Sequence, residues 1–204
     1  MKKILAVAVL MLVCASAAFA AEAVKNPLSY YIGAGYAKEL ESGAPGGSIA
    51  GQAGVDYMVT PDISVGAMAG FYMLGSTTVT DPLTNYSAKA KTSVIPITAS
   101  AAYHIASSGS LKPRVEAGAG LYIMHASVDV TDASGNSVSS VLSGSSNTSK
   151  FGFNVGAGAE IDNGKSMTYG AEARFHLIPS AGTDSSGNST SAKMLSIVLT
   201  LGFK

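Results

Sequence analysis

Eight short stretches of this chain alternate apolar residues with small or polar ones, residue by residue. A period of two is the pattern of a β-strand, because successive side chains of a strand point to opposite faces of a sheet. The stretches cover residues 28–37, 48–59, 63–73, 95–105, 111–125, 151–161, 169–177 and 195–203. The sequence therefore predicts an all-β chain of eight consecutive strands.

Charged residues within these stretches keep to one parity, and the opposite parity is apolar. Within the parts that would span a membrane, the charged set is Asp56, Arg114, Glu116, Glu160, Glu172 and Arg174. An Arg or Lys facing lipid at the midplane of a bilayer costs about 2–4 kcal/mol, so a lipid-facing surface must exclude such residues. Aromatic residues gather near the strand ends, as they do at membrane interfaces: Tyr36, Tyr57, Phe71, Tyr103, Phe151, Tyr169 and Phe203. We therefore predict an eight-stranded antiparallel up-and-down transmembrane β-barrel whose charged residues line the lumen.

The connections between the strands are alternately short and long after the first strand pair. Short turns are predicted at residues 60–62, 106–110 and 162–165, and long polar loops at 75–91, 129–150 and 180–191. Bacterial barrels have short periplasmic turns and longer extracellular loops. Both termini are therefore expected in the periplasm, with the long loops outside the cell.

Two local irregularities are expected within the strands. Pro96 lacks a backbone donor, which favours a bulge or a strand start there. The apolar parity changes after His125, because Val128 and Val130 occupy the other face. This change predicts either a bulge or a strand end that projects above the membrane.

The N-terminus has the pattern of a secretory signal peptide. Two lysines precede the apolar run 4–13, and small residues lead to a predicted cleavage between Ala20 and Ala21. An uncleaved anchor is the alternative, but the run is shorter than the roughly 20 residues that a spanning helix needs. We expect a cleaved leader at 1–20 and one barrel domain at 21–204.

Composition excludes several other functions. Charged residues make up 13% of the chain and balance in sign, so no basic surface is available to bind nucleic acid. The one cysteine, Cys14, lies in the predicted leader, which leaves no disulfide and no catalytic thiol in the mature protein. A soluble β-sandwich or a lipocalin-like barrel remains the rival fold, because it also alternates and can also be secreted.

Three glycine-rich motifs resemble small outer-membrane β-barrel domains, the family that includes OmpA-like, OmpX-like and OmpW-like barrels. These motifs are Tyr31-Ile32-Gly33-Ala34-Gly35-Tyr36, the segment 109–120 with Val115-Glu116-Ala117-Gly118-Ala119-Gly120, and Gly156-Ala157-Gly158-Ala159-Glu160. The resemblance covers essentially the whole mature chain. It implies an outer-membrane location in a Gram-negative envelope and insertion by the barrel-assembly machinery, which reads a final strand ending on an aromatic residue. Here Phe203 is followed by Lys204.

The lumen of an eight-stranded barrel is just wide enough for side chains to fill it. Because an unpaired buried carboxylate is costly, Arg114 and Arg174 are expected to bridge Glu116, Glu160 or Glu172 across the lumen. Such a network could be a permanent plug or a gate that re-pairs to admit water and small ions. The primary hypothesis is a non-enzymatic, monomeric barrel with a plugged lumen and a role in envelope integrity or surface contacts.

Two other functions stay open. One is an OmpW-like narrow channel for small or apolar solutes. The other is a lipid A-modifying enzyme, because His125 and Ser127 lie two residues apart on one strand face, slightly like the lipid A deacylase barrels. The three histidines lie on separate strands without metal-ligand spacing, so no metal and no cofactor are expected. Membrane lipid is the expected partner.

Overall fold

The computed structural model describes residues 27–41, 44, 46–107, 109–134, 136, 138, 144–163, 166–183, 187 and 189–204. The predicted leader, with its cleavage site between Ala20 and Ala21, lies outside the described residues. Across the described part of the chain, no helix is long and apolar enough to cross a membrane.

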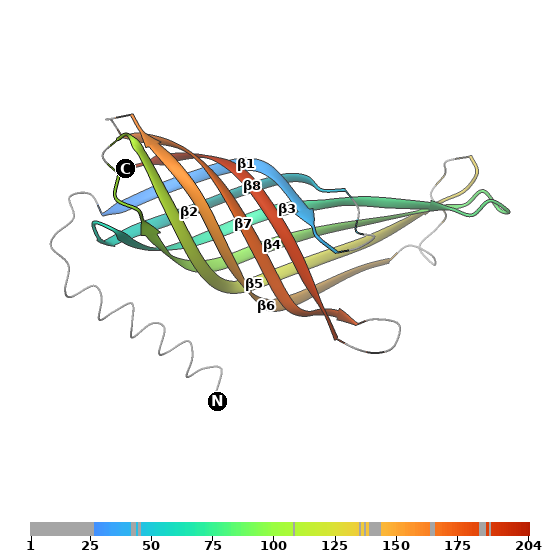
Figure 1. The fold of residues 1–204 in the computed structure, drawn as a ribbon. Helices are drawn as coiled ribbons and strands as arrows, with labels where there is room; N and C mark the ends of the chain where they lie inside the picture. Colours follow the sequence, from blue (N-terminus) through green and yellow to red (C-terminus); the bar gives the residue numbers. More distant parts are fainter. Residues whose placement is uncertain are drawn as a thin grey trace.

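The described residues form a closed barrel of eight antiparallel strands in sequence order, as predicted (Figure 1). Each strand pairs with the next, and the last returns to pair with the first. The strands are β1 (Leu28–Glu39), β2 (Ser48–Thr60), β3 (Ile63–Thr80), β4 (Ser87–His104), β5 (Leu111–Thr131), β6 (Gly144–Asp162), β7 (Met167–Thr183) and β8 (Ser189–Phe203). Closure leaves no unpaired edge strand.

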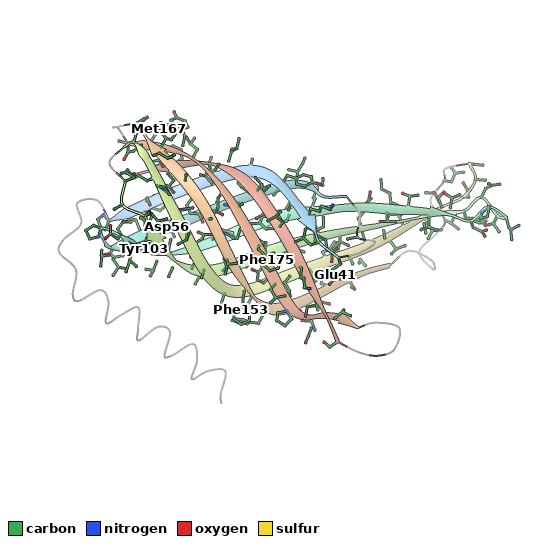
Figure 2. The ribbon with its side chains drawn as sticks, in the orientation of Figure 1. Glu41, Asp56, Tyr103, Phe153, Met167 and Phe175 are labelled. Carbon is green, nitrogen blue, oxygen red and sulfur yellow. The ribbon has the colours of Figure 1, made fainter. Side chains whose placement is uncertain are left out.

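The barrel has two unlike ends, which we call the terminal end and the loop end. At the terminal end β1 begins and β8 finishes, and Tyr30 lies opposite Phe203. The tight turn between β2 and β3 also lies there, where the hydroxyl of Thr60 accepts a hydrogen bond from the amide of Ile63 at 3.0 Å. The loop end carries the longer connections, and Figure 2 places Glu41 toward it and Tyr103 toward the terminal end.

Outward and inward residues alternate over the predicted stretches of the strands. Ile49 and Leu199 are 69% and 70% exposed, whereas Tyr72 and Met194 are fully buried. An apolar surface of this extent is unfavourable in water and favourable against lipid. One orientation that the alternation predicts is wrong: Val59 has the parity opposite to that of Asp56 and is therefore expected to face outward, but it is buried. The β2–β3 register shifts between Met58 and Thr60, and this irregularity turns the side chain of Val59 away from the outer face.

The strands on the loop-end side are longer than expected. The predicted loop 75–91 is mostly strand, because β3 continues to Thr80 and β4 already begins at Ser87. Likewise the predicted loop 129–150 is reduced by β5 and β6, and the loop 180–191 by β7 and β8. Polar residues pair across these extensions, for example Thr78 with Lys89. The backbone ladder therefore extends beyond the apolar band into segments where no large apolar residues alternate to reveal it.

Neither expected irregularity is a bulge. The β4–β5 ladder runs through Pro96, which lies opposite Tyr122, and β4 starts nine residues before it. On the β3 side, Ala69 pairs with Ile97 and Tyr72 with Val94, so the register resumes unchanged beyond the proline. After His125, β5 continues to Thr131 in an unbroken register with its neighbours. The change of apolar parity there corresponds to a strand that projects past the apolar band.

Candidate functional site

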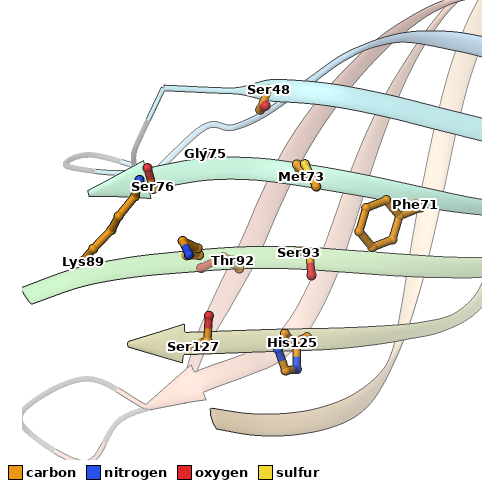
Figure 3. Close-up of a pocket in the computed structure, with 11 residues that line it drawn as sticks. Ser48, Phe71, Met73, Gly75, Ser76, Lys89, Thr92, Ser93, His125 and Ser127 are labelled. Carbon is orange, nitrogen blue, oxygen red and sulfur yellow. The ribbon is translucent and has the colours of Figure 1, made fainter. Parts of the chain in front are cut away.

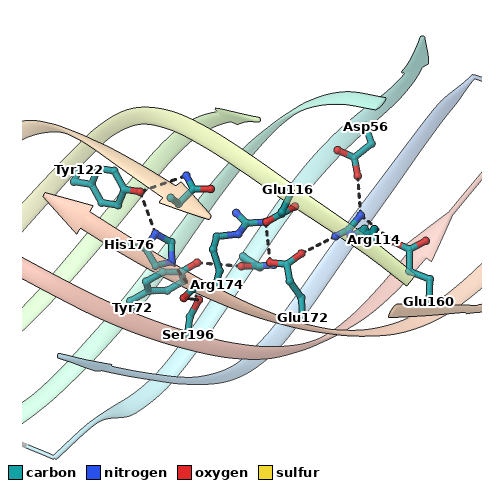
Figure 4. Close-up of polar contacts among 12 residues, drawn as sticks. Asp56, Tyr72, Arg114, Glu116, Tyr122, Glu160, Glu172, Arg174, His176 and Ser196 are labelled. Atoms are coloured by element: carbon teal, nitrogen blue, oxygen red, sulfur yellow. Dashed lines mark hydrogen bonds and ion pairs between the residues drawn. The ribbon is translucent and has the colours of Figure 1, made fainter. Parts of the chain in front are cut away.

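The lumen is the site at which the chain gathers its buried polar side chains. All six charged residues predicted for it have inward parity and come from four strands: Asp56 from β2, Arg114 and Glu116 from β5, Glu160 from β6, and Glu172 and Arg174 from β7. Figure 4 shows them converging on one another inside the barrel. They come together because β5, β6 and β7 pair in a register that places their inward-facing charged residues next to one another on the terminal-end side.

Arg114 is the cation nearer the terminal end. Its guanidinium lies 2.6 Å from Glu172, 2.9 Å from Glu160 and 3.3 Å from Asp56. It also lies over the ring of Tyr31, 5.9 Å from the ring centre. One arginine thereby ties β5 to strands β1, β2, β6 and β7.

Arg174 is the cation nearer the middle of the lumen. It is 1% exposed and pairs with Glu116 at 2.5 Å and with Glu172 at 2.7 Å. Glu172 is thus shared by both arginines, and it also accepts a hydrogen bond from Gln52 at 3.4 Å. The six charges form one connected network rather than separate pairs, in which two guanidinium groups face four carboxylates.

A neutral polar layer lies next to the charged network. His176 is fully buried; its Nδ1 contacts the hydroxyl of Tyr122 at 3.0 Å and its Nε2 contacts Ser196 at 3.2 Å. Its ring meets those of Tyr72 and Tyr122 edge-on, at centre distances of 5.4 and 5.7 Å. The hydroxyl of Tyr72 in turn donates to Gln52 at 3.0 Å, which joins this layer to the charged one.

Toward the loop end the lumen is filled by apolar side chains, most of which the sequence analysis did not place in a strand. We call them the apolar layer; its members are Ala37, Ala50, Leu74, Val94, Ile178, Ala192 and Met194, all buried. Five of them, Leu74, Val94, Ile178, Ala192 and Met194, lie just beyond the predicted stretches. Their inward parity was the available signal, but it was hidden because those stretches were predicted too short.

The many glycines of the strands provide the space that the large lumen side chains occupy. A Cβ on Gly54 would lie 2.5 Å from the ring of Tyr31, and one on Gly152 would lie 2.8 Å from the ring of Tyr122. Native interiors reach close packing by setting large residues against small ones. The glycines of the strands therefore leave the space that the large side chains need to fill the lumen.

At the terminal end the lumen opens into a polar vestibule of about 400 Å³. Asp56, Arg114 and Glu160 line its inner side, and His104 and Lys112 line its rim. Solvent can reach the outer carboxylates of the network from here, while Arg174 and Glu172 remain buried. The neutral polar layer and the apolar layer lie beyond the vestibule, toward the loop end.

The three histidines occupy separate places, as their sequence positions indicated. His104 contacts Ser64 at 2.9 Å by the vestibule, His176 lies in mid-lumen, and His125 is on the outer face of β5. Within the described residues there is no cluster of three or more His, Cys, Asp or Glu side chains that could hold a metal ion.

The closed ring, the apolar outer face and the polar lumen define a membrane β-barrel. A family model, the outer membrane protein beta-barrel domain, matches residues 5–203, and the chain belongs to that family. It is accordingly a protein of the outer membrane of a Gram-negative envelope, and the soluble sandwich and lipocalin-like alternatives are wrong.

The chain is similar in fold to several solved barrels. Neisserial surface protein A (NspA) superimposes with a TM-score of 0.57 at 18% identity, over 87% of this chain and 97% of that one. The outer membrane protein OprG from Pseudomonas aeruginosa superimposes with a TM-score of 0.50 at 12% identity, over 86% and 94% of the two chains. At these identities the likeness establishes the fold alone. No curated protein sequence matches the chain.

Proposed function

We propose that this protein is a non-enzymatic outer-membrane barrel with a plugged lumen, whose loop end faces the exterior and makes surface contacts. The observation that supports the proposal is that buried side chains of the charged network and the apolar layer fill the lumen. Tyr72, Arg174 and Met194 are each at most 1% exposed. An eight-stranded barrel has no width to spare around such side chains.

The hairpin of β3 and β4 supports a role in surface contacts. At its tip, the carboxylate of Asp81 accepts hydrogen bonds from the amide of Leu83 at 3.0 Å and the hydroxyl of Thr84 at 2.7 Å. These bonds hold the pKa of Asp81 below its ordinary value. The same hydrogen bonds order the turn that carries Leu83. Leu83 is 91% exposed, and Tyr86, three residues later, is also exposed. Exposed apolar side chains on an ordered projection are typical of a contact surface.

The arrangement around His125 supports the non-enzymatic reading. Its Nδ1 contacts the amide oxygen of Asn147 at 2.7 Å, which could orient the imidazole, but nucleophilic catalysis also needs a hydrogen bond between the histidine and the nucleophile. The nearby carboxylate of Asp129 instead pairs with Lys91 at 2.7 Å. Ser127 is on the same strand face, and among the described residues no hydrogen bond joins it to His125.

The plug predicts that the purified wild-type barrel gives no stable single-channel steps in planar bilayers. Replacing Glu172 and Arg174 with alanine is expected to lower the temperature at which the barrel unfolds. This variant should still give no single-channel steps in the bilayer, because the apolar layer lies beyond the charged network. Steps appear only when Leu74 and Met194 are also replaced with alanine, provided that heat-modifiable gel mobility shows this variant folded. Stable steps from the wild type would refute the plug and favour the narrow channel.

The orientation predicts opposite labelling of cysteines at the two ends. The chain's one cysteine lies in the predicted leader, so an introduced cysteine is expected to be the one thiol of the mature protein that the reagent can label. Leu83→Cys, at the β3–β4 tip, is expected to react with a membrane-impermeant maleimide on intact cells. Asp62→Cys, in the exposed β2–β3 turn, is the matched control and is expected to react only after the outer membrane is permeabilised. The reverse pattern would overturn the orientation.

A further inference from the structure

Lysines on the outer face of the barrel are confined to one end. Among the described residues, the strand lysines that share the parity of the lipid-facing side chains are Lys38, Lys89, Lys91 and Lys193. All four lie at the loop end. Lys112 and Lys204, at the terminal end, instead pair with Asp162. The outer wall therefore gains lysines only toward the loop end, beyond the apolar band, where a bilayer has its headgroups.

Two of these lysines line a groove on the outer face of β3, β4 and β5. The groove has a volume of about 300 Å³, and Lys89, Lys91, Ser127 and His125 lie along it above Phe71 (Figure 3). This volume is at the lower end of the range for small-molecule sites and suits part of a larger amphiphile.

The strand register arranges the groove in rows. Met73 lies opposite Ser93, and Ser93 lies opposite His125, which makes the first polar row above the apolar band. One step further from the band, Ser76 lies opposite Lys91, and Lys91 opposite Ser127. Below both rows is Phe71, whose exposed ring belongs to the lipid-facing surface.

The two lysines of the groove are only partly neutralised by the protein. Lys91 pairs with Asp129 at 2.7 Å, with both side chains about half exposed. Lys89 has no carboxylate within ion-pair distance among the described residues. Two ammonium groups therefore share one carboxylate, and hydroxyl groups from three strands surround them. The groove thus offers positive charge and several hydrogen-bonding groups directly above an apolar surface.

We propose that this groove binds lipopolysaccharide, the phosphorylated and multiply acylated glycolipid of the outer leaflet. Lys89 and Lys91 take a sugar phosphate, the hydroxyl groups of Ser76, Ser93 and Ser127 contact sugar oxygens, and an acyl chain lies over Phe71 and Met73. A glycerophospholipid would supply a phosphate and acyl chains but no sugar for the three serine hydroxyls. The inference rests on the proposed function in one respect, since it requires the loop end to face the exterior.

The test is a titration of the full barrel in lipid nanodiscs with purified rough-type lipopolysaccharide, read by native mass spectrometry. The Lys89→Gln/Lys91→Gln variant is expected to bind about tenfold more weakly than wild type, from the loss of two ammonium groups near the lipid surface. Lys38→Gln/Lys193→Gln is the matched control: it removes two outward lysines at the same end of the barrel but away from the groove. It is expected to bind within about twofold of wild type. Asp129→Asn is expected to tighten binding, because it releases Lys91.

Three results would overturn the proposal. Equal weakening in both lysine variants would indicate a diffuse charge effect without a site. Equal affinity for phosphatidylglycerol would indicate a general anionic-lipid surface, and undiminished binding of dephosphorylated lipopolysaccharide would exclude the phosphate contact. Heat-modifiable gel mobility of each variant separates loss of binding from loss of folding. Nanodiscs present lipid to both ends of the barrel, so the binding titration does not depend on the orientation of the barrel in the cell. A negative titration can therefore be told apart from a failure of the proposed function, which the conductance and Leu83 labelling experiments test.

Discussion

Replacing Arg174 with alanine is expected to lower the free energy of unfolding by about 3–5 kcal/mol, the usual cost of removing one partner from a buried ion pair. Arg174 contacts Glu116 at 2.5 Å and Glu172 at 2.7 Å, and all three side chains are at most 4% exposed. Without the guanidinium, Glu116 loses its cation, and Glu172 keeps only Arg114. Urea unfolding of the refolded barrel in detergent measures the change.

Two further variants show whether this loss comes from unpaired charge. Lys112→Ala removes the ion pair between Lys112 and Asp162, whose charged atoms are 3.3 Å apart. Because the lysine side chain is half exposed, this variant should lower the free energy of unfolding by less than about 1 kcal/mol. The triple variant Glu116→Gln/Glu172→Gln/Arg174→Met removes the charges together and should recover much of the stability, as replaced buried ion networks do. If Arg174→Ala left the free energy of unfolding nearly unchanged, the charged network would not be what holds the lumen together.

The alternation of side chains made the fold and the lumen charges predictable. Period-two patterning assigns each residue a face, and the cost of charge in lipid places Arg114 and Arg174 inside with the carboxylates as their partners. The pattern does not encode the stagger between strands, which decides the height at which two inward residues meet. The shared position of Glu172 between both arginines therefore needed the structure.

The strand ends at the loop side were not predictable from the same pattern. Segments such as 75–80 and 87–91 pair with each other in the ladder, but apart from Val79 they hold only small or polar residues, so no alternation of large apolar residues marks them. Because those segments looked like loops, Leu74 and Ile178 looked like loop-adjacent residues rather than members of the apolar layer. Val59 was misassigned for a related reason, since a register shift at a strand end inverts the parity.

The packing of glycine against neighbouring strands gives the second large expected effect, in Gly120→Ala. A Cβ on Gly120 would overlap the carbonyl oxygen of Ile97 and lie 2.6 Å from the Cα of Thr98, which is backbone of the adjacent strand. Backbone in a closed ladder cannot move aside as a flexible side chain can, so β4 and β5 must separate locally. We expect a loss of about 3 kcal/mol, the upper part of the range for overpacked sites.

Gly51→Ala is the matched control for this effect, because it adds the same methyl group to a strand glycine on the outer face. The nearest atom that its Cβ would meet is a backbone oxygen 4.0 Å away, so unfolding in urea should shift little or toward higher stability. Equal destabilisation by both substitutions would mean that loss of glycine from a strand matters in itself, irrespective of contact. A large difference would show that the close approach of β4 to β5 at Gly120 requires glycine there, and that this approach sets the narrow lumen on which the plug depends.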